Sequence, residues 1–315
     1  MTTVSLRPPN PREFMQRYGL VLSILLLGAA LTLLSDRFLT AGNIVIVLRQ
    51  ATINGIIAVG MTFVILTAGI DLSVGALLAL STVVTADLMQ QGLAVPLALL
   101  AGLGIGAGLG LVNGLIITKT LVPPFVTTLG MMTIARGLAL SYTQGRPITG
   151  LPESFRFMGT GSLGPVPMPI LIAALTFLAG WLLLNRTATG QYIFAIGNNP
   201  VAARYAGVAV NRYTTLVYVI SGFLAALAGM ILVARLNSAQ PTAGLAYEFD
   251  AIAAVVVGGT SFAGGQGGLG GTLLGVLIIA VLNNGLNLLN VSSFYQQIVT
   301  GVVIALALLL YKAVR

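Results

Sequence analysis

A single acidic residue, Asp71, lies inside a long apolar stretch, in the glycine-bounded segment 69–75 (GIDLSVG). We expect Gly69 to end one helix in the left-handed conformation. The Asp71 carboxylate would then accept a hydrogen bond from the backbone N–H of Ser73 or Val74 at the start of the next helix. This cap is a structural role, and a gate or part of a permeation path is the functional alternative. A proton-coupling role is disfavoured, because a relay needs several ionisable groups at depth.

A second glycine-rich interruption, at 258–268, follows another β-branched apolar run and precedes another Leu-rich stretch. Paired interruptions of this kind predict an internal duplication, which is a frequent plan among transporters, and the relative orientation of the two halves stays open. The residues that we predict to form a gate or a helix break are Gly69, Asp71, Ser73, Gly75, Gly258, Gly259, Thr260 and Ser261.

Asparagines at positions 283, 287 and 290 are spaced by four and three residues, which places them on one face of a helix. Unpaired amides cost on the order of several kcal/mol in hydrocarbon, so this face must point at protein or water. Hydrogen bonding between helices is one explanation, and a hydrated route for a neutral, polyhydroxylated solute such as a sugar is the other. The candidate path residues are Asn54, Thr62, Thr67, Asn113, Asn283, Asn287 and Asn290.

The composition predicts how these residues are held. Of the 315 residues, 57% are hydrophobic and only 7% are charged, against about 25% in ordinary soluble domains. At roughly 20 residues per span, we expect an all-α integral membrane protein with about ten transmembrane helices, which excludes secreted, nuclear and cytosolic proteins. One transmembrane domain, 18–312, would follow a polar tail at 1–17 and precede a short C-terminus at 313–315. The apolar stretches are 18–35, 44–68, 72–90, 94–117, 124–143, 168–185, 214–235, 249–262, 270–289 and 294–312.

The basic residues predict the orientation. The net charge is +8, but the basic residues form no dense patch, so a nucleic-acid partner is not expected. With the N-terminus inside, the outer loops hold only Arg37, Arg146 and Arg156, while most other basic residues fall in inner loops. The positive-inside rule therefore places both termini in the cytoplasm. The longest outer, periplasmic loop is then 144–167, and the longest cytoplasmic loop is 186–213.

The cytoplasmic loop carries signals for a short helix. Asn199 is a good N-cap, Pro200 sits at the favoured first position, and Gly207 is a good stop. This predicts a two-turn helix with Arg204 and Tyr205 exposed, either an ordinary surface turn or a docking element for a protein partner. The candidate docking residues are Asn198, Asn199, Pro200, Ala203, Arg204, Tyr205 and Gly207.

Glycines at four-residue spacing mark one further helix face, through Gly102, Gly106, Gly110 and Gly114. Small residues at that spacing let membrane helices approach closely, so we expect tight packing within one subunit, with a contact between subunits as the alternative.

Several kinds of chemistry are absent from the sequence. There is no Cys and no His, which removes disulfides, thiolates and imidazole metal sites. The two lysines, Lys119 and Lys312, are not part of a phosphate-binding loop, and no G-x-S-x-G occurs. The chain should therefore hold no metal or cofactor and should not hydrolyse ATP itself.

Both glycine-rich breaks, the asparagine stripe and the predicted short helix resemble segments of the membrane-spanning permeases of bacterial ribose-type ABC importers. The resemblance runs from about residue 14 to 312, and its motifs are 58–62, 64–67, 69–75, 195–198, 202–204, 234–244, 250–256, 258–261, 263–265, 283–289 and 291–293. It implies a homodimer in the bacterial inner membrane, with ATP and Mg bound by separate ATP-binding subunits and a periplasmic sugar-binding protein above. It also implies that 198–207 couples the ATPase to the permease.

The sequence is compatible with three functions to different degrees. The leading one is alternating-access import of ribose or a closely related monosaccharide, driven by a partner ATPase. An ion-coupled secondary sugar transporter, acting alone with Asp71 as the coupling site, is the alternative. An intramembrane enzyme lacks a catalytic constellation.

Overall fold

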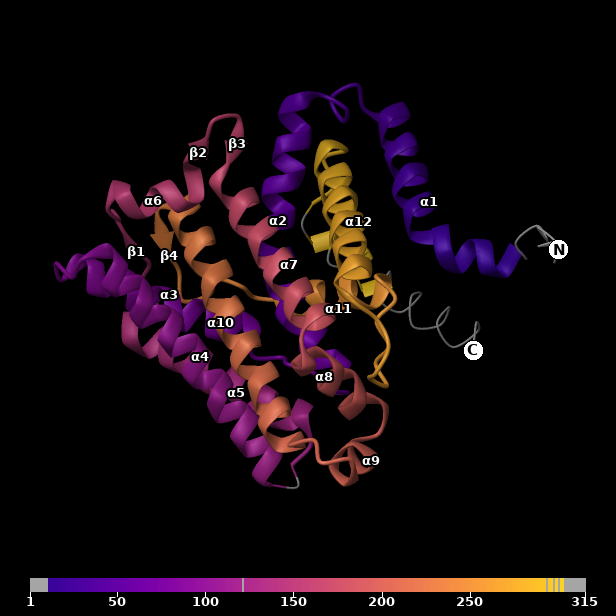
Figure 1. Ribbon diagram of the computed structural model, residues 1–315. Helices are drawn as coiled ribbons and strands as arrows, with labels where there is room; N and C mark the ends of the chain where they lie inside the picture. The colour runs from indigo at the N-terminus through magenta and orange to yellow at the C-terminus, as the bar shows by residue number, and fades with distance from the viewer. Residues whose placement is uncertain (1–10, 121, 293, 297, 300, 303–315) are drawn as a thin grey trace.

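The computed structural model describes residues 11–120, 122–292, 294–296, 298–299 and 301–302. The described chain is helical, with four two-residue strands (Figure 1). The helices are α1 (Pro11–Leu34), α2 (Ala41–Leu66), α3 (Val74–Gln90), α4 (Val95–Lys119), α5 (Pro124–Thr143), α6 (Glu153–Thr160), α7 (Met168–Arg186), α8 (Ala188–Asn198), α9 (Pro200–Tyr205), α10 (Val210–Leu236), α11 (Tyr247–Val257) and α12 (Leu269–Leu288). The strands are β1 (Ile148–Thr149), β2 (Ser162–Leu163), β3 (Val166–Pro167) and β4 (Ser238–Ala239).

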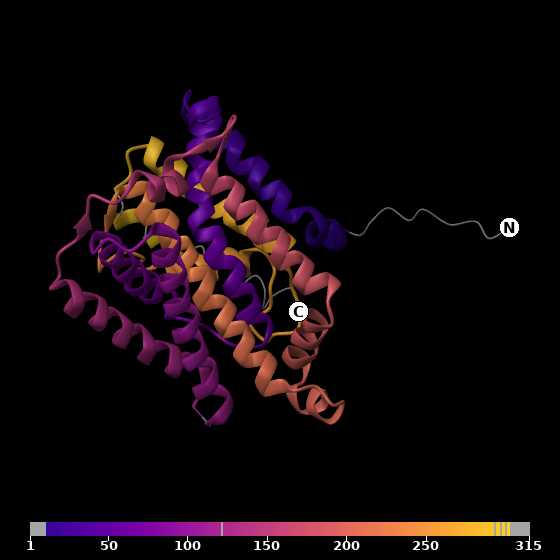
Figure 2. The same ribbon diagram turned by 60° about the vertical axis from the view of Figure 1, so that its left-hand side comes forward.

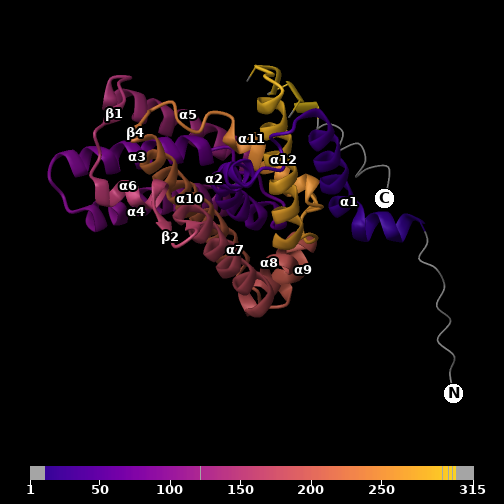
Figure 3. The same cartoon turned by 90° about the horizontal axis from the view of Figure 1, so that it is seen from above.

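Helix α2 lies at the centre of the bundle (Figure 3), where it packs against α7, α10, α11 and α12. From Gly55 to Leu66 every residue of α2 is buried. A helix that is apolar on all sides is stable only inside a bundle or in lipid, which explains its central position. α10 is similarly buried along its second half and packs against α2, α3 and α4.

The expected class, an all-helical membrane protein, is confirmed. Five described helices are long and apolar enough to cross a membrane: α2, α4, α7, α10 and α12. Shorter apolar helices are Tyr18–Leu34 and α3. The expected span at 249–262 is instead α11, with 11 residues and a length of about 17 Å, against a hydrocarbon core of about 30 Å. It is too short to cross alone.

The predicted ends of the chain lie partly outside the described residues. α1 begins at Pro11, inside the expected 1–17 tail. Residues 1–10, most of the expected final span at 294–312 and the expected C-terminus at 313–315 are not covered.

The expected outer loop, 144–167, is more structured than predicted. It contains α6 and strands β1 to β3, and β1 pairs antiparallel with β4, with Ile148 opposite Ala239. The backbone N–H of Leu151 donates to Asn237 Oδ1 at 3.0 Å. The segment is therefore fastened to the chain that follows α10.

The glycine face of α4 packs against α10, as the spacing predicted. A Cβ on Gly106 would lie 2.4 Å from the Gly222 carbonyl oxygen, and one on Gly110 would lie 2.2 Å from that of Tyr218. On the opposite face, Gly104 and Gly108 have open space around them. The contact is within one chain, and glycine is required because backbone meets backbone there.

We expect Gly110→Ala to destabilise the bundle by about 1–3 kcal/mol, because the added methyl group must push α4 away from the α10 backbone. Gly108→Ala is the matched control, and it should be neutral or slightly stabilising since it adds helix propensity without a clash. Thermal unfolding of both variants in detergent measures the difference. Equal losses of stability would contradict the packing argument.

Candidate functional site

The first helix break begins where α2 ends. The Ala68 N–H donates to the Ile65 carbonyl at 2.9 Å, and the Gly69 N–H donates to that of Val64 at 3.1 Å. This is a Schellman-type end, and its left-handed residue is Ala68, with φ of 59°. The prediction that Gly69 supplies the left-handed conformation is wrong. Gly69 is needed for space, since a Cβ there would lie 2.3 Å from the Tyr218 hydroxyl oxygen.

Asp71 lies fully buried in this break and fastens it to α10. Its Oδ1 accepts hydrogen bonds from the backbone N–H of Ser73 at 3.0 Å and from the Ser73 hydroxyl at 2.6 Å. Its Oδ2 accepts from the Ser221 hydroxyl at 2.8 Å. Asn113 Nδ2 donates in turn to Ser73 Oγ at 3.0 Å. The Ser73 donor is thus one of the two that the sequence predicted, and the link to Ser221 adds a bond across the bundle.

The second break connects α11 to α12 through closely packed backbone. A Cβ on Gly258 would lie 2.4 Å from the Gly271 carbonyl oxygen, and one on Gly275 would lie 1.9 Å from that of Ala254. The loop closes on itself, because the Ser261 N–H donates to the Gln266 carbonyl at 2.9 Å. Thr260 and Ser261 are both buried.

The two breaks meet each other and the end of α8 at one place, which we call the junction: Leu66, Gly197, Asn198 and Gly265. The Gly265 N–H donates to the Leu66 carbonyl at 2.9 Å. Asn198 Nδ2 donates to the Gly265 carbonyl at 3.4 Å and to that of Phe194 at 2.9 Å. A Cβ on Gly197 would lie 1.9 Å from the Leu66 carbonyl oxygen and 2.3 Å from the Gly265 nitrogen. The end of α8 is wedged between both breaks.

The short helix predicted in the 186–213 segment is present as α9. The Asn199 side chain accepts from the Ala202 N–H at 2.9 Å, Pro200 is the first helical residue, and Gly207 follows with φ of 85°. Ala203 is buried, whereas Arg204 and Tyr205 are exposed. α9 and the α4–α5 turn lie at the same end of the bundle (Figure 2). The preceding helix, α8, is an element that the sequence analysis missed.

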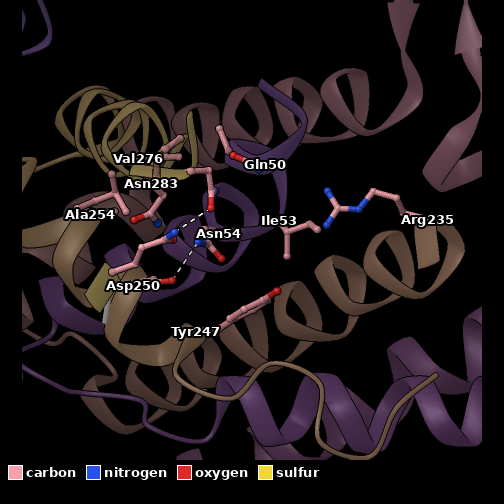
Figure 4. A pocket seen from close by; sticks show the side chains of 14 residues that line it. Gln50, Ile53, Asn54, Arg235, Tyr247, Asp250, Ala254, Val276 and Asn283 are labelled. Atoms are coloured by element: carbon pink, nitrogen blue, oxygen red, sulfur yellow. Dashed lines mark hydrogen bonds between the residues drawn. The ribbon is translucent and has the colours of Figure 1, made fainter. Parts of the chain in front are cut away.

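A polar cavity of about 200 Å³ lies between α2, α11 and α12 (Figure 4). Asn54 Nδ2 donates to Asp250 Oδ2 at 3.4 Å, and Gln296 Nε2 donates to Asn287 Oδ1 at 2.8 Å. The residues that line the cavity are Gln50, Ala51, Ile53, Asn54, Arg235, Tyr247, Asp250, Ala254, Val276, Ile279, Ala280, Asn283, Asn287 and Gln296. It combines an apolar wall with convergent amides and two charged groups, which is typical of a small-molecule site.

Comparison with known proteins gives the family. The model of the permease component of branched-chain amino acid transport systems matches residues 43–308. The chain belongs to this permease family. The permease is therefore a transport component rather than an enzyme.

Named relatives match over nearly the whole permease. It is 52% identical to the ribose import permease protein RbsC of Bacillus subtilis (strain 168), over 94% of this chain and 92% of the relative. It is 48% identical to RbsC of Escherichia coli (strain K12), over 98% and 97%. A probable ABC transporter permease protein of the same strain, YphD, is 40% identical over 95% and 91%. No solved structure matches the chain. The resemblance seen in the sequence is confirmed.

The permease brings together three of the seven predicted path residues. Asn54, Asn283 and Asn287 line the cavity. Asn290 follows the end of α12 with φ of 57° and is exposed. Asn284, next to the predicted stripe, exchanges hydrogen bonds of 2.9 Å with Asn43, so it fastens α12 to α2.

The other three predicted path residues make structural contacts away from the cavity. Thr62 Oγ1 lies 2.8 Å from Thr272 Oγ1 between α2 and α12, and Thr67 donates to the Val64 carbonyl at the end of α2. Asn113 belongs to the network around Asp71.

Sequence reasoning missed five polar residues of the cavity: Gln50, Arg235, Tyr247, Asp250 and Gln296. One signal was available for Gln50, which is four residues before Asn54 and therefore on the same helix face. Asp250 and Arg235 are charged residues in expected spans, which is a signal of function, but the segments that bring them to one cavity meet only in the folded bundle.

Proposed function

We propose that the chain is the membrane-spanning subunit of an ATP-driven importer that carries ribose, or a closely related monosaccharide, by alternating access. The observation that carries this proposal is the identity of 48–52% to two ribose import permeases over more than nine-tenths of each chain. A cytoplasmic ATPase subunit that binds ATP and Mg, a periplasmic sugar-binding protein and a second permease copy would complete the transporter. It would lie in the bacterial inner membrane with both termini in the cytoplasm.

The geometry supports a route by which a movement of the ATPase subunit displaces the two helix breaks. α9 presents an exposed Arg204 and Tyr205, residue types that are enriched in protein contacts. Asn199 links α9 directly to α8, and the end of α8 is wedged into the junction. A displacement of α9 by the ATPase would therefore move backbone in both helix breaks. The coupling segment 198–207 and the two breaks would act as one mechanical unit.

The experiment that tests the function is reconstitution. We expect the permease to copurify with its candidate ATPase subunit, and ATP hydrolysis in lipid to be stimulated by ribose-loaded binding protein. Assembly without stimulation by ribose would exclude ribose as cargo, and allose-loaded binding protein would be tested next. Sugar accumulation by vesicles that contain the permease alone would contradict the proposal and indicate an ion-coupled carrier.

The docking role of α9 is tested by reversing one charge. Arg204→Glu should lower the stimulated ATPase and ribose uptake by about tenfold or more, because it places repulsion in a protein interface. The permease should still insert and fold, since Arg204 is exposed and its hydrogen bond is to Asn211 Oδ1 at 3.2 Å on the surface. Lys119→Glu is the matched control, as an exposed charge at the same end of the bundle on α4. Equal effects of both variants would contradict a specific role for α9.

A further inference from the structure

The cavity between α2, α11 and α12 offers an excess of hydrogen-bond acceptors. The Gln50 Oε1 and Asn283 Oδ1 atoms are buried and have no hydrogen-bond partner among the described residues. Among the described residues, the Asp250 carboxylate accepts one side-chain hydrogen bond, a long one of 3.4 Å from Asn54 Nδ2. A carboxylate can accept about four hydrogen bonds, so Asp250 has acceptor capacity that the described protein leaves unused. Buried acceptors without donors are costly, which points to a donor supplied from outside the chain.

The two charged groups of the cavity lie apart. Asp250 faces Asn54 on one side, and the Arg235 guanidinium extends inward from the opposite side, beyond Ile53 (Figure 4). Between them the Tyr247 side chain lines the same space. A ligand that donates at one end and accepts at the other would complement both groups.

The cavity is large enough for such a ligand. Its volume of about 200 Å³ is far above the about 15 Å³ that holds one water molecule. Asn54 is 12 positions before Leu66 on α2, so the cavity lies about 18 Å along the helix from the junction. The cavity is therefore separate from the junction, although α2 contributes to both.

We propose that this cavity is a sugar-holding site, in which Asp250, Gln50 and Asn283 accept hydrogen bonds from the hydroxyl groups of a monosaccharide and Arg235 donates to its oxygens. The proposal rests on the function proposed above and names the residues by which the permease itself selects its cargo. Asp250 is the principal acceptor, because hydrogen bonds to a charged group are the stronger ones.

The unsatisfied acceptors favour a sugar over an amino acid. Each hydroxyl group of a monosaccharide both donates and accepts, so one molecule can serve Asp250, Gln50 and Asn283 at separate points and still accept from Arg235. A zwitterion such as leucine matches Asp250 and Arg235 with its two charges. Its donors, however, sit on one ammonium group, and its apolar side chain leaves the two amide oxygens unpaired. Such unpaired groups are the basis on which polar sites reject analogues.

The absence of cysteine from the chain allows a direct test. Ala280 lines the cavity and is 7% exposed, so Ala280→Cys introduces a single thiol there. We expect ribose to slow its modification by a small, water-soluble methanethiosulfonate at least about fivefold, in the complete permease–ATPase complex without binding protein. Ser162→Cys, on exposed strand β2, is the matched control, and its modification should be independent of ribose. Leucine should protect neither thiol.

A second substitution assigns the protection to Asp250. Combined with Ala280→Cys, Asp250→Asn should raise the ribose concentration needed for half-protection by about tenfold, since the amide keeps the shape but removes the charge. In transport assays, Asp250→Asn should raise the ATP hydrolysed per ribose imported.

Each remaining outcome counts against the site. Modification of Ala280→Cys at the same rate with and without ribose, or no modification in any nucleotide state, overturns it. Protection by leucine instead of ribose overturns the sugar class. If the complex still assembles and its ATPase still responds to ribose-loaded binding protein, either of these results contradicts the cavity site but not the proposed function. If the ATPase does not respond to ribose-loaded binding protein, the proposed function itself is contradicted.

Discussion

Replacing Gly197 with alanine should lower ribose uptake at least about tenfold while the permease still assembles with its ATPase subunit. The added Cβ would lie 1.9 Å from the Leu66 carbonyl oxygen and 2.3 Å from the Gly265 nitrogen. Both are backbone atoms, which cannot rotate aside, so the end of α8 must move out of the junction. The contact that we propose to carry motion from α9 to the two breaks would then be lost. Uptake and ATP hydrolysis, measured together in proteoliposomes, give the ratio of sugar to ATP, which should fall.

The control for this prediction is another helical glycine near the second break. Gly270 lies in the first turn of α12 and has open space around it, so Gly270→Ala should leave uptake unchanged. Asn198→Ala tests the same junction more gently, since it removes side-chain bonds of 2.9 and 3.4 Å without a clash. It should give an intermediate loss of coupling. An unchanged sugar-to-ATP ratio in Gly197→Ala would contradict the transmission of motion through the junction.

The elements predicted best from the sequence are those that local chemistry determines. Helix α9 follows from three residues of the segment 199–207, Asn199, Pro200 and Gly207, each of which has a conformational reason for its position. The glycine face of α4 follows from a four-residue period and from the small number of ways in which membrane helices can approach. Neither prediction requires knowledge of distant parts of the chain.

The same kind of reasoning was wrong at the end of α2, where Ala68 takes the left-handed conformation and Gly69 does not. A glycine can be needed for its left-handed conformation or for its lack of a side chain, and the sequence does not show which of these applies. Here the missing side chain matters, since the Tyr218 hydroxyl occupies the space beside Gly69. Tyr218 is on α10, almost 150 positions away, so the competing demand is visible only in the folded bundle.

The polar cavity is the feature that the sequence predicted least completely. Its polar groups come from α2, α10, α11, α12 and the segment that follows α12. The asparagine stripe identified two of them, because the spacing in α12 is periodic. Asp250 was not predicted as a cavity residue because the segment around it was expected to span the membrane. In the structure, α11 is a short helix that is followed by α12. Where a helix ends inside the bundle depends on packing, which hydropathy alone does not reveal.

The prediction for Asp71 separates its structural role from an ion-coupling role. Asp71→Ala should destabilise the permease by about 3–5 kcal/mol, because each of three buried donors left without its acceptor costs about 1–3 kcal/mol. The hydroxyls of Ser73 and Ser221 and the Ser73 N–H would each lose an acceptor in a fully buried place. Thermal unfolding in detergent and the yield of folded protein measure the loss. Ser221→Ala removes one of the three bonds and should cost about 1–2 kcal/mol.

Asp71→Asn is the informative partner of Asp71→Ala. The amide oxygen can still accept from Ser73, and the amide NH₂ can donate to the Ser221 hydroxyl, which accepts as well as donates. If Asp71 fastens the first break to α10, Asp71→Asn should retain most of the stability and a measurable rate of ribose uptake. If its charge instead coupled an ion to transport, Asp71→Asn would be stable and inactive. A stable, fully active Asp71→Ala variant would contradict both roles, since it would show that the break holds its shape without the carboxylate.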